Sequence, residues 1–241
     1  AVAYVHQFHT RFLAGRLGNT ITGWSGVLLA LLAISGLILW WPAKIVRVRP
    51  GATGWRLAFD LHQTVGAFVW VFLLVLAGTG LVIHWNEGAS SLAYRITGAH
   101  PTPPFPRTVP ECQGRPILGA DTLLSVARAQ VPGARATVIG VPDDPAVPVR
   151  AQFKFPEDVT PAGRTLVFLA ACSGRPVQVL SSRTAPVAYR MTRMWNREIH
   201  TGELWGWPTR ILAALASLAL PLMALTGPLM WWGRRKQAST A

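Results

Sequence analysis

Histidine is the residue type whose placement in this chain points most directly to chemistry. Five of the six histidines lie at the ends of three long apolar segments, and none lies between Pro101 and Ile199. Imidazole is a common ligand of metal ions and of haem iron, and it is costly inside a bilayer unless something binds it. The five candidates for axial ligation are His6, His9, His62, His84 and His200.

An internal repeat singles out two of these histidines. The first and third apolar segments carry residues of the same types at offsets 0, 6, 27, 31 and 32. The two matching sets are His9, Gly15, Gly36, Trp40 and Trp41, and His200, Gly206, Gly227, Trp231 and Trp232. Five matches in one register rarely arise by chance, so the two segments occupy related positions. Equivalent helices place His9 and His200 at the same height, and we predict that both are axial ligands of one centre.

The second apolar segment offers two further ligand candidates. It ends in Thr79-Gly80 and then His84, where the other two segments end in Ser35-Gly36 or Thr226-Gly227 and a tryptophan. His62 and His84 are 22 residues apart, which puts them on one helix face roughly 33 Å apart. His84 could replace His9 or His200, whereas His62 lacks an obvious partner. The alternative for each histidine is an interfacial anchor. His6 is a weaker candidate, and His100 is expected in a loop.

Three transmembrane helices must position these histidines. The segments Leu17–Trp41, Val65–Trp85 and Ile211–Trp232 contain no Asp, Glu, Lys or Arg. A helix of about 20 residues crosses a hydrocarbon core of about 30 Å. We therefore expect helices at about 17–41, 64–85 and 208–232. Tryptophans mark their ends: Trp40, Trp41, Trp55, Trp85, Trp205, Trp207, Trp231 and Trp232.

The charges of the short loops predict an orientation. Basic residues dominate the first loop and the C-terminus, and such segments remain cytoplasmic in bacterial inner membranes. The polar region would then be periplasmic. The residues concerned are Lys44, Arg47, Arg49, Arg56, Arg234, Arg235 and Lys236. Topology thus accounts for part of the net charge of +13, and no nucleic-acid partner is expected. The remaining basic residues suit a solvated surface near anionic lipid, or the docking of an acidic redox partner.

The polar region predicts a small α+β domain. We expect a proline-rich linker over Thr102–Pro116, then a helix over Ala120–Gln130 with Asp121 as its N-cap. Four strands should follow as an antiparallel sheet, over Ala136–Val141, Val147–Phe155, Thr165–Ala171 and Val177–Leu180. The fold class is a mainly α integral membrane protein with this extracytoplasmic domain. Its parts are expected at residues 1–86, 87–200 and 201–241.

This polar region carries no hydrolytic triad, no HExxH motif and no phosphate-binding glycine loop. The only cysteines are Cys112 and Cys172. In an oxidising compartment a structural disulfide between them is plausible, and free thiols are the alternative.

Several stretches together resemble the PepSY-associated transmembrane family of iron-regulated inner-membrane proteins, some of which look like haem-containing siderophore reductases. The resemblance rests on His9-Thr-Arg-Phe-Leu-Ala-Gly15, Ser35-Gly-Leu-Ile-Leu-Trp-Trp-Pro42, Asp60-Leu-His62-Gln-Thr-Val-Gly66, Thr79-Gly80 and Ile199-His200-Thr-Gly-Glu203. Residues 117–182 are similar to a PepSY domain. Members of this type usually have four transmembrane helices. A further helix, or a neighbouring subunit, could supply the partner of His62.

These observations lead to one main hypothesis and two rivals. The main hypothesis is a membrane protein with one or two b-type haems that passes electrons to a ferric chelate or a redox partner, with quinol or a dehydrogenase as donor. Arg11 and Arg197, and also Arg16, Arg193 and Arg56, could pair with haem propionates. The rivals are an accessory electron-transfer subunit of a larger complex, and a haem-free scaffold that regulates an extracytoplasmic protein.

Overall fold

The computed structural model describes residues 2–238, and within α8 it leaves out the side chains of Arg234, Lys236, Gln237 and Ala238. The chain divides into two compact units. The membrane unit comprises Ala1–Trp85, Ile199–Gly202 and Gly206–Ala241. The polar unit comprises Asn86–Glu198 and Glu203–Trp205. The predicted basic tail extends to residue 241, and its last three residues lie outside the described range.

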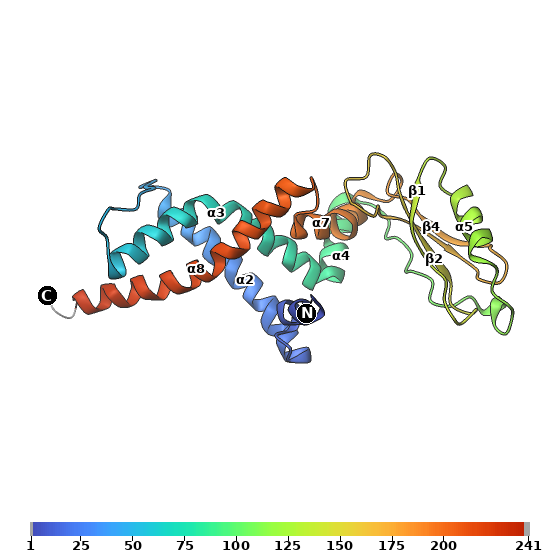
Figure 1. Ribbon diagram of the computed structural model, residues 1–241, viewed down its shortest axis with the longest axis horizontal. Coiled ribbons are helices and arrows are strands. Elements are labelled where there is room, and N and C mark those ends of the chain that lie inside the picture. Colours follow the sequence, from blue (N-terminus) through green and yellow to red (C-terminus); the bar gives the residue numbers. More distant parts are fainter. Residues whose placement is uncertain (1, 239–241) are drawn as a thin grey trace. The chain divides into compact units, whose positions relative to one another are not determined.

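Three long helices form most of the membrane unit (Figure 1). They are α2 (Gly15–Trp40), α3 (Gly54–His84) and α8 (Trp207–Ala238), and the short helix α1 (Val2–Arg11) precedes them. Gly15–Trp40, Gly54–His84 and Trp207–Gly233 are long and apolar enough to cross a membrane. The three expected transmembrane helices are therefore confirmed, and α3 packs against both α2 and α8.

Helix α3 begins about ten residues before the expected start, because its first turns carry Arg56 and Asp60 and are not uniformly apolar. Asp60 is 2% exposed. It accepts hydrogen bonds from the backbone amide and Nε of Arg49, both at 3.0 Å, and from Nη2 at 2.6 Å. These bonds tie the basic loop between α2 and α3 to the first turns of α3.

The outer surface of the membrane unit is apolar. Large side chains on its helices are widely exposed, among them Leu39 at 81% and Leu218 at 72%. Small residues are instead found where the helices meet, including Ala58, Ala77 and Ala216. Such a surface needs lipid to cover it, because exposed apolar patches of this extent are unfavourable in water.

The polar unit contains a four-stranded antiparallel sheet in the order β1-β2-β3-β4. The strands are β1 (Arg135–Gly140), β2 (Val149–Lys154), β3 (Thr165–Leu169) and β4 (Pro176–Leu180). Strand β1 is shifted by one residue from its predicted range, β2 and β3 are shorter than predicted, and β4 begins one residue earlier. The unit also contains α4 (Asn86–Thr97), the 3₁₀ turn η1 (Pro110–Cys112), α5 (Ala120–Ala129), α6 (Val187–Tyr189) and the π-helix η2 (Arg190–Trp195). Helix α7 (Asn196–Thr201) crosses the boundary between the units. The predicted α+β fold is confirmed.

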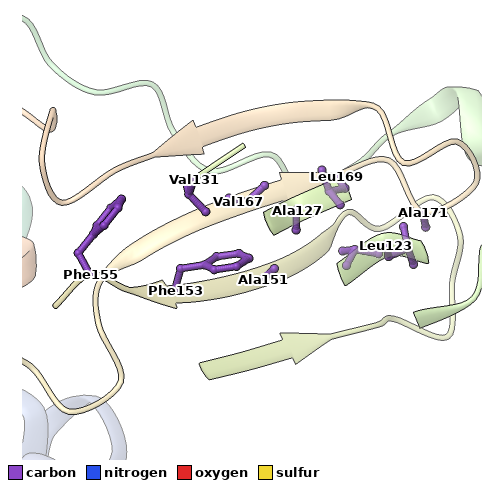
Figure 2. Close-up of a cluster of buried hydrophobic side chains, with 10 residues drawn as sticks. Leu123, Ala127, Val131, Ala151, Phe153, Phe155, Val167, Leu169 and Ala171 are labelled. Atoms are coloured by element: carbon purple, nitrogen blue, oxygen red, sulfur yellow. The ribbon is translucent and has the colours of Figure 1, made fainter. Parts of the chain in front are cut away.

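The core of the polar unit lies between α5 and one face of the sheet (Figure 2). Leu123 and Ala127 of α5 pack against Phe153 of β2 and against Val167 and Leu169 of β3, all of them fully buried. Alternate residues of a strand share a face, so Leu166 and Phe168 lie on the other side of β3, where they pack with Met194. Strand β3 is thus covered on both faces.

One prediction for this unit is wrong. The N-cap of α5 is Gly119, and Asp121 lies within the first turn, where its carboxylate still complements the helix dipole. The proline-rich segment is irregular apart from η1, as expected of a linker, and it packs on the sheet. Val109 and Cys112 are buried, and the Phe105 ring lies 5.2 Å from that of Phe168. Scattered apolar anchors hold this segment on the sheet without any periodicity.

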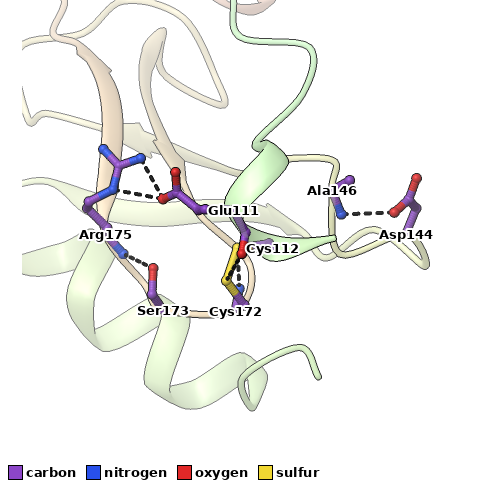
Figure 3. The surroundings of a disulfide bond; sticks show 7 residues. All are labelled: Glu111, Cys112, Asp144, Ala146, Cys172, Ser173 and Arg175. Carbon is purple, nitrogen blue, oxygen red and sulfur yellow. Dashed lines mark hydrogen bonds and ion pairs between the residues drawn. A yellow bond between two sulfur atoms is a disulfide. The ribbon is translucent and has the colours of Figure 1, made fainter. Parts of the chain in front are cut away.

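Cys112 and Cys172 form a disulfide that joins η1 to the turn after β3 (Figure 3). The Cys172 amide donates to Cys112 Sγ at 3.2 Å. Beside the bridge, Arg175 donates to Glu111 Oε1 from Nε at 2.9 Å and from Nη2 at 2.6 Å. The prediction of a structural bridge is confirmed, and it closes a separation of 60 residues.

Candidate functional site

His9 and His200 lie next to each other within the membrane unit. His9 is in the last turn of α1 and His200 in the last turn of α7. Their ring centres are 6.1 Å apart and the ring planes are inclined at 39°. The structure thus brings together the two histidines that the repeat predicts to face one centre, although they come from opposite ends of the chain.

Hydrogen bonding fixes the protonation of the His200 ring. Its Nδ1 lies 2.9 Å from Thr79 Oγ1 on α3. The single hydroxyl hydrogen of Thr79 is used in a bond to the Val75 carbonyl oxygen at 2.6 Å. Thr79 must therefore accept the bond from His200, so the hydrogen is on Nδ1 and Nε2 carries a free lone pair. This is the form in which imidazole binds a metal.

The surroundings of His200 disfavour the protonated ring. Burial lowers the pKa of His200 and the nearby His9 lowers it further, while a hydrogen bond with the Leu76 backbone raises it. A neutral ring favours ligation, because a proton and a metal compete for the same nitrogen. On α3 the ring lies over Gly80, where a Cβ would be 3.3 Å from its Cε1. The neighbouring pair Thr79-Gly80 thus provides both the acceptor and the space for this ring.

His62 lies on α3 and has equivalent surroundings, which α8 provides. Its Nδ1 lies 2.9 Å from Thr226 Oγ1, and Thr226 donates to the Leu222 carbonyl oxygen at 2.7 Å. A Cβ on Gly227 would be 3.5 Å from His62 Cε1. The same reasoning assigns the His62 hydrogen to Nδ1 and leaves Nε2 free. The relation is reciprocal: α3 carries His62, which rests on α8, and its own Thr79-Gly80 receives the histidine that precedes α8.

Each of these rings lies beside a Thr-Gly pair, and Ser35-Gly36 on α2 is a third copy of this hydroxyl–glycine pattern. Among the described residues, no histidine ring contacts this copy. Ser35 Oγ donates to the Leu32 carbonyl oxygen at 3.2 Å. A Cβ on Gly36 would have no neighbouring atom within 4 Å in the part of the chain that the structure describes. The pattern therefore differs from copy to copy in whether a ring occupies it.

His84 lies against a different helix. A Cβ on Gly23 of α2 would be only 2.3 Å from His84 Nε2, and the Trp85 ring centre is 4.5 Å from that of His84. Its Nε2 consequently faces the α2 backbone. The assignment of His84 as a ligand stays a prediction. His6 is exposed on α1, and His100 lies in a loop as expected.

The arginines proposed for propionates lie on the surface. Arg11 and Arg16 are exposed near His9 in the sequence, and Arg193 and Arg197 are exposed in the polar unit. Arg56 is exposed near His62 in the sequence, with its guanidinium 5.6 Å from the centre of the Trp55 ring. Their roles toward an anionic group stay predictions.

Within residues 2–238, no group of three or more His, Cys, Asp or Glu side chains could enclose a bare metal ion. Haem iron has a different requirement, because the porphyrin supplies four of its ligands and the protein needs to supply only two. Two neighbouring imidazoles, one of which has a free Nε2, match that requirement. The donor set at His9 and His200 therefore fits haem rather than an isolated metal ion.

Three membrane-spanning helices and a small α+β unit define an integral membrane protein with a compact polar domain between its second and third spans. The family profile of the PepSY-associated TM region matches residues 1–234, and the chain belongs to this family. No curated protein sequence matches the chain significantly.

Proposed function

We propose that this protein is a b-type haem protein that transfers electrons at the bacterial inner membrane, with His9 and His200 as the axial ligands of one haem. The separation of their rings carries the proposal. Metal–histidine nitrogen bonds are about 2.0 Å long, so two imidazoles that held one iron between them would have ring centres roughly 6 Å apart. The observed separation is 6.1 Å.

Two axial imidazoles determine what such a haem can do. By holding both axial positions, His9 and His200 would restrict a bound haem to single-electron exchange and would leave no site for oxygen. The task of this chain is then to hold the two rings, of which that of His200 is half-buried and that of His9 is exposed.

His62 supports a second haem near the other end of α3. It has the same Nδ1 bond and free Nε2 as His200. It is 17 residues from Thr79, which is about 25 Å along a helix. Two haems at this spacing would carry electrons across the membrane. The ligand opposite His62 would come from a helix of a longer chain or from a neighbouring subunit.

The proposed reaction is one-electron reduction of a ferric chelate such as a siderophore complex, or of a redox partner protein. Chelators built for hard Fe(III) hold the softer Fe(II) less tightly, so reduction releases the iron. The sequence has no flavin or nicotinamide fingerprint. The electrons would therefore come from quinol or from a dehydrogenase partner.

Absorbance of the purified full-length chain tests the proposal. We expect a Soret band, an α-band near about 560 nm after dithionite reduction, and a whole-number ratio of haem to polypeptide. His9→Ala and His200→Ala should each lose the same haem, whereas His6→Ala and His100→Ala are matched controls that should retain it. A protein without a Soret band overturns the haem proposal. Spectra unchanged in both ligand variants overturn the ligand pair.

A second candidate function is an electron-transfer subunit of a larger membrane complex. The observation that favours it is His62. Its Nδ1 is bonded to Thr226 and its Nε2 is free, whereas the histidine in ring contact with His200 among the described residues is His9. Stoichiometric copurification of another membrane protein, with recovery of a second haem in that complex, would support it. A full haem complement in the isolated chain would contradict it.

A further inference from the structure

We infer that Thr79 and Thr226 are positioning residues, each of which orients one axial histidine and lowers the reduction potential of the haem that this histidine binds. The inference rests on the proposed function and extends it to residues that do not touch the haem. It concerns Thr79 with His200, and Thr226 with His62.

Each threonine is oriented by its own helix before it meets the histidine. Thr79 Oγ1 lies 2.6 Å from the Val75 carbonyl oxygen and 3.2 Å from that of Leu76. Thr226 Oγ1 lies 2.7 Å from the carbonyl oxygen of Leu222 and 3.5 Å from that of Met223. Since its hydrogen points back along the helix, the hydroxyl presents only lone pairs to the imidazole. It can accept from Nδ1–H and cannot donate to it.

The glycine after each threonine lets the ring reach this acceptor. Rings rest over Gly80 and Gly227, where a Cβ would be 3.3 Å and 3.5 Å from the histidine Cε1 atoms. Two interactions thus fix each ring, the hydrogen bond at Nδ1 and the contact of the Nδ1–Cε1 edge with the glycine. The Nε2 atom lies more than 4 Å from the Cβ position at either glycine and takes no part in these contacts.

The three copies of the pattern distinguish ligand positioning from ordinary helix packing. Small residues and back-bonded hydroxyls are common at helix contacts in membranes. At Ser35-Gly36 both features are present without a ring. In the other two copies a histidine lies 2.9 Å from the hydroxyl oxygen. Ser35 is therefore an internal control for effects that arise from packing alone.

The hydrogen bond has a definite effect on the iron. A hydroxyl that accepts from Nδ1–H makes the imidazole more basic at Nε2, as outer hydrogen-bond partners of metal-bound histidines do. A more basic ligand stabilises Fe(III) more than Fe(II), so the bond lowers the reduction potential. Removal of the hydroxyl should consequently raise the potential of the attached haem.

The test is a potentiometric titration of the purified full-length holoprotein carrying Thr79→Val or Thr226→Val. We expect each substitution to shift the Fe(III)/Fe(II) equilibrium about threefold to tenfold toward Fe(II). This is a rise of roughly 28–59 mV, at 59 mV per decade for one electron. Thr79→Val should affect the haem bound by His200, and Thr226→Val the haem bound by His62. Thr79→Ser and Thr226→Ser keep the hydroxyl and should restore the wild-type potentials, while Ser35→Ala should change neither.

The outcomes separate this inference from the proposed function. Wild-type protein without haem overturns the proposed function and the inference with it. If the wild-type protein binds haem but neither valine variant changes the reduction potentials, the inference alone is overturned. Equal shifts in the valine and serine variants also overturn it, because the hydroxyl would then have no role. Where a valine variant does not accumulate, the alanine variant at that position is titrated instead, with the same expected rise.

Discussion

Glycines in the membrane unit allow histidine rings to approach the helix backbones closely. The space between the glycine and the ring differs from site to site. A Cβ would be 2.3 Å from His84 Nε2 at Gly23, 3.3 Å from His200 Cε1 at Gly80 and 3.5 Å from His62 Cε1 at Gly227. A methyl group fits at ordinary contact distance only at Gly227. The sequence identifies these glycines as small residues on helices, but it does not say which ring each one faces.

At the residue scale, Gly23→Ala tests the place of His84. The added methyl would collide with the His84 ring, and we expect a loss of about 1–3 kcal/mol, as is typical of overpacking. The measurement is the thermal stability of the purified protein, together with its haem content. Haem content should be unchanged, because His9 and His200 supply the ligands in our proposal.

Gly36→Ala is the matched control, since no described atom lies within 4 Å of that position. It should be neutral or slightly stabilising, because alanine is preferred over glycine in a helix by about 1 kcal/mol. If Gly23→Ala and His84→Ala both lose haem, and lose the same amount, then His84 is a ligand and the pairing of His9 with His200 is wrong.

At the scale of elements, long apolar segments were predictable because length and composition alone define a membrane span. The strands of the polar unit were predictable from alternation and turn residues. Three features were not predictable from the sequence. Helices α1 and α4 are short and mixed in composition, and the first turns of α3 contain Asp60 among apolar residues. The contacts of Thr79 and Thr226 with histidines 121 and 164 residues away depend on how helices align, which a single sequence does not encode.

The Arg49–Asp60 interaction gives a prediction for the loop between α2 and α3. Asp60→Ala removes the acceptor of three hydrogen bonds from Arg49. The Arg49 side chain is 43% exposed, so solvent screening keeps the expected loss of stability small. The loop should loosen, and trypsin should cut after Arg47 faster in opened vesicles. Asp143→Ala, in the polar unit, is a control that should leave this cleavage rate unchanged. An unaltered rate in Asp60→Ala would show that the loop is held by other contacts.

The disulfide gives a second prediction at this scale. In the chain-entropy relation, a bridge across 60 residues stabilises the folded state by about 4 kcal/mol at most. We expect the double variant Cys112→Ala/Cys172→Ala to unfold its polar unit at lower denaturant concentration, as followed by proteolysis of the full chain. Wild-type protein kept in reductant should behave like the variant. Equal resistance of oxidised and reduced wild-type protein would contradict a stabilising role.

At the scale of the whole molecule, the basic segments and the apolar spans must be consistent with a single orientation of the chain in the membrane. If all three candidate spans cross the membrane, α1 and the end of α8 lie on opposite sides of it. The basic loop between α2 and α3 is then on the same side as the end of α8. Because basic loops stay in the cytoplasm, we propose that the polar unit and the His9–His200 pair face the periplasm.

Labelling of single cysteines tests this orientation. The described residues contain no free cysteine, so the wild-type chain serves as an unlabelled control. Val46→Cys lies in the basic loop at an exposed position, and Thr108→Cys is exposed in the polar unit. A membrane-impermeant maleimide should label Thr108→Cys in intact spheroplasts, and Val46→Cys only after lysis. The reverse result would place the His9–His200 pair at the cytoplasmic face, where a haem could not pass electrons directly to a periplasmic ferric chelate, and that acceptor would have to be abandoned even if both haems are present.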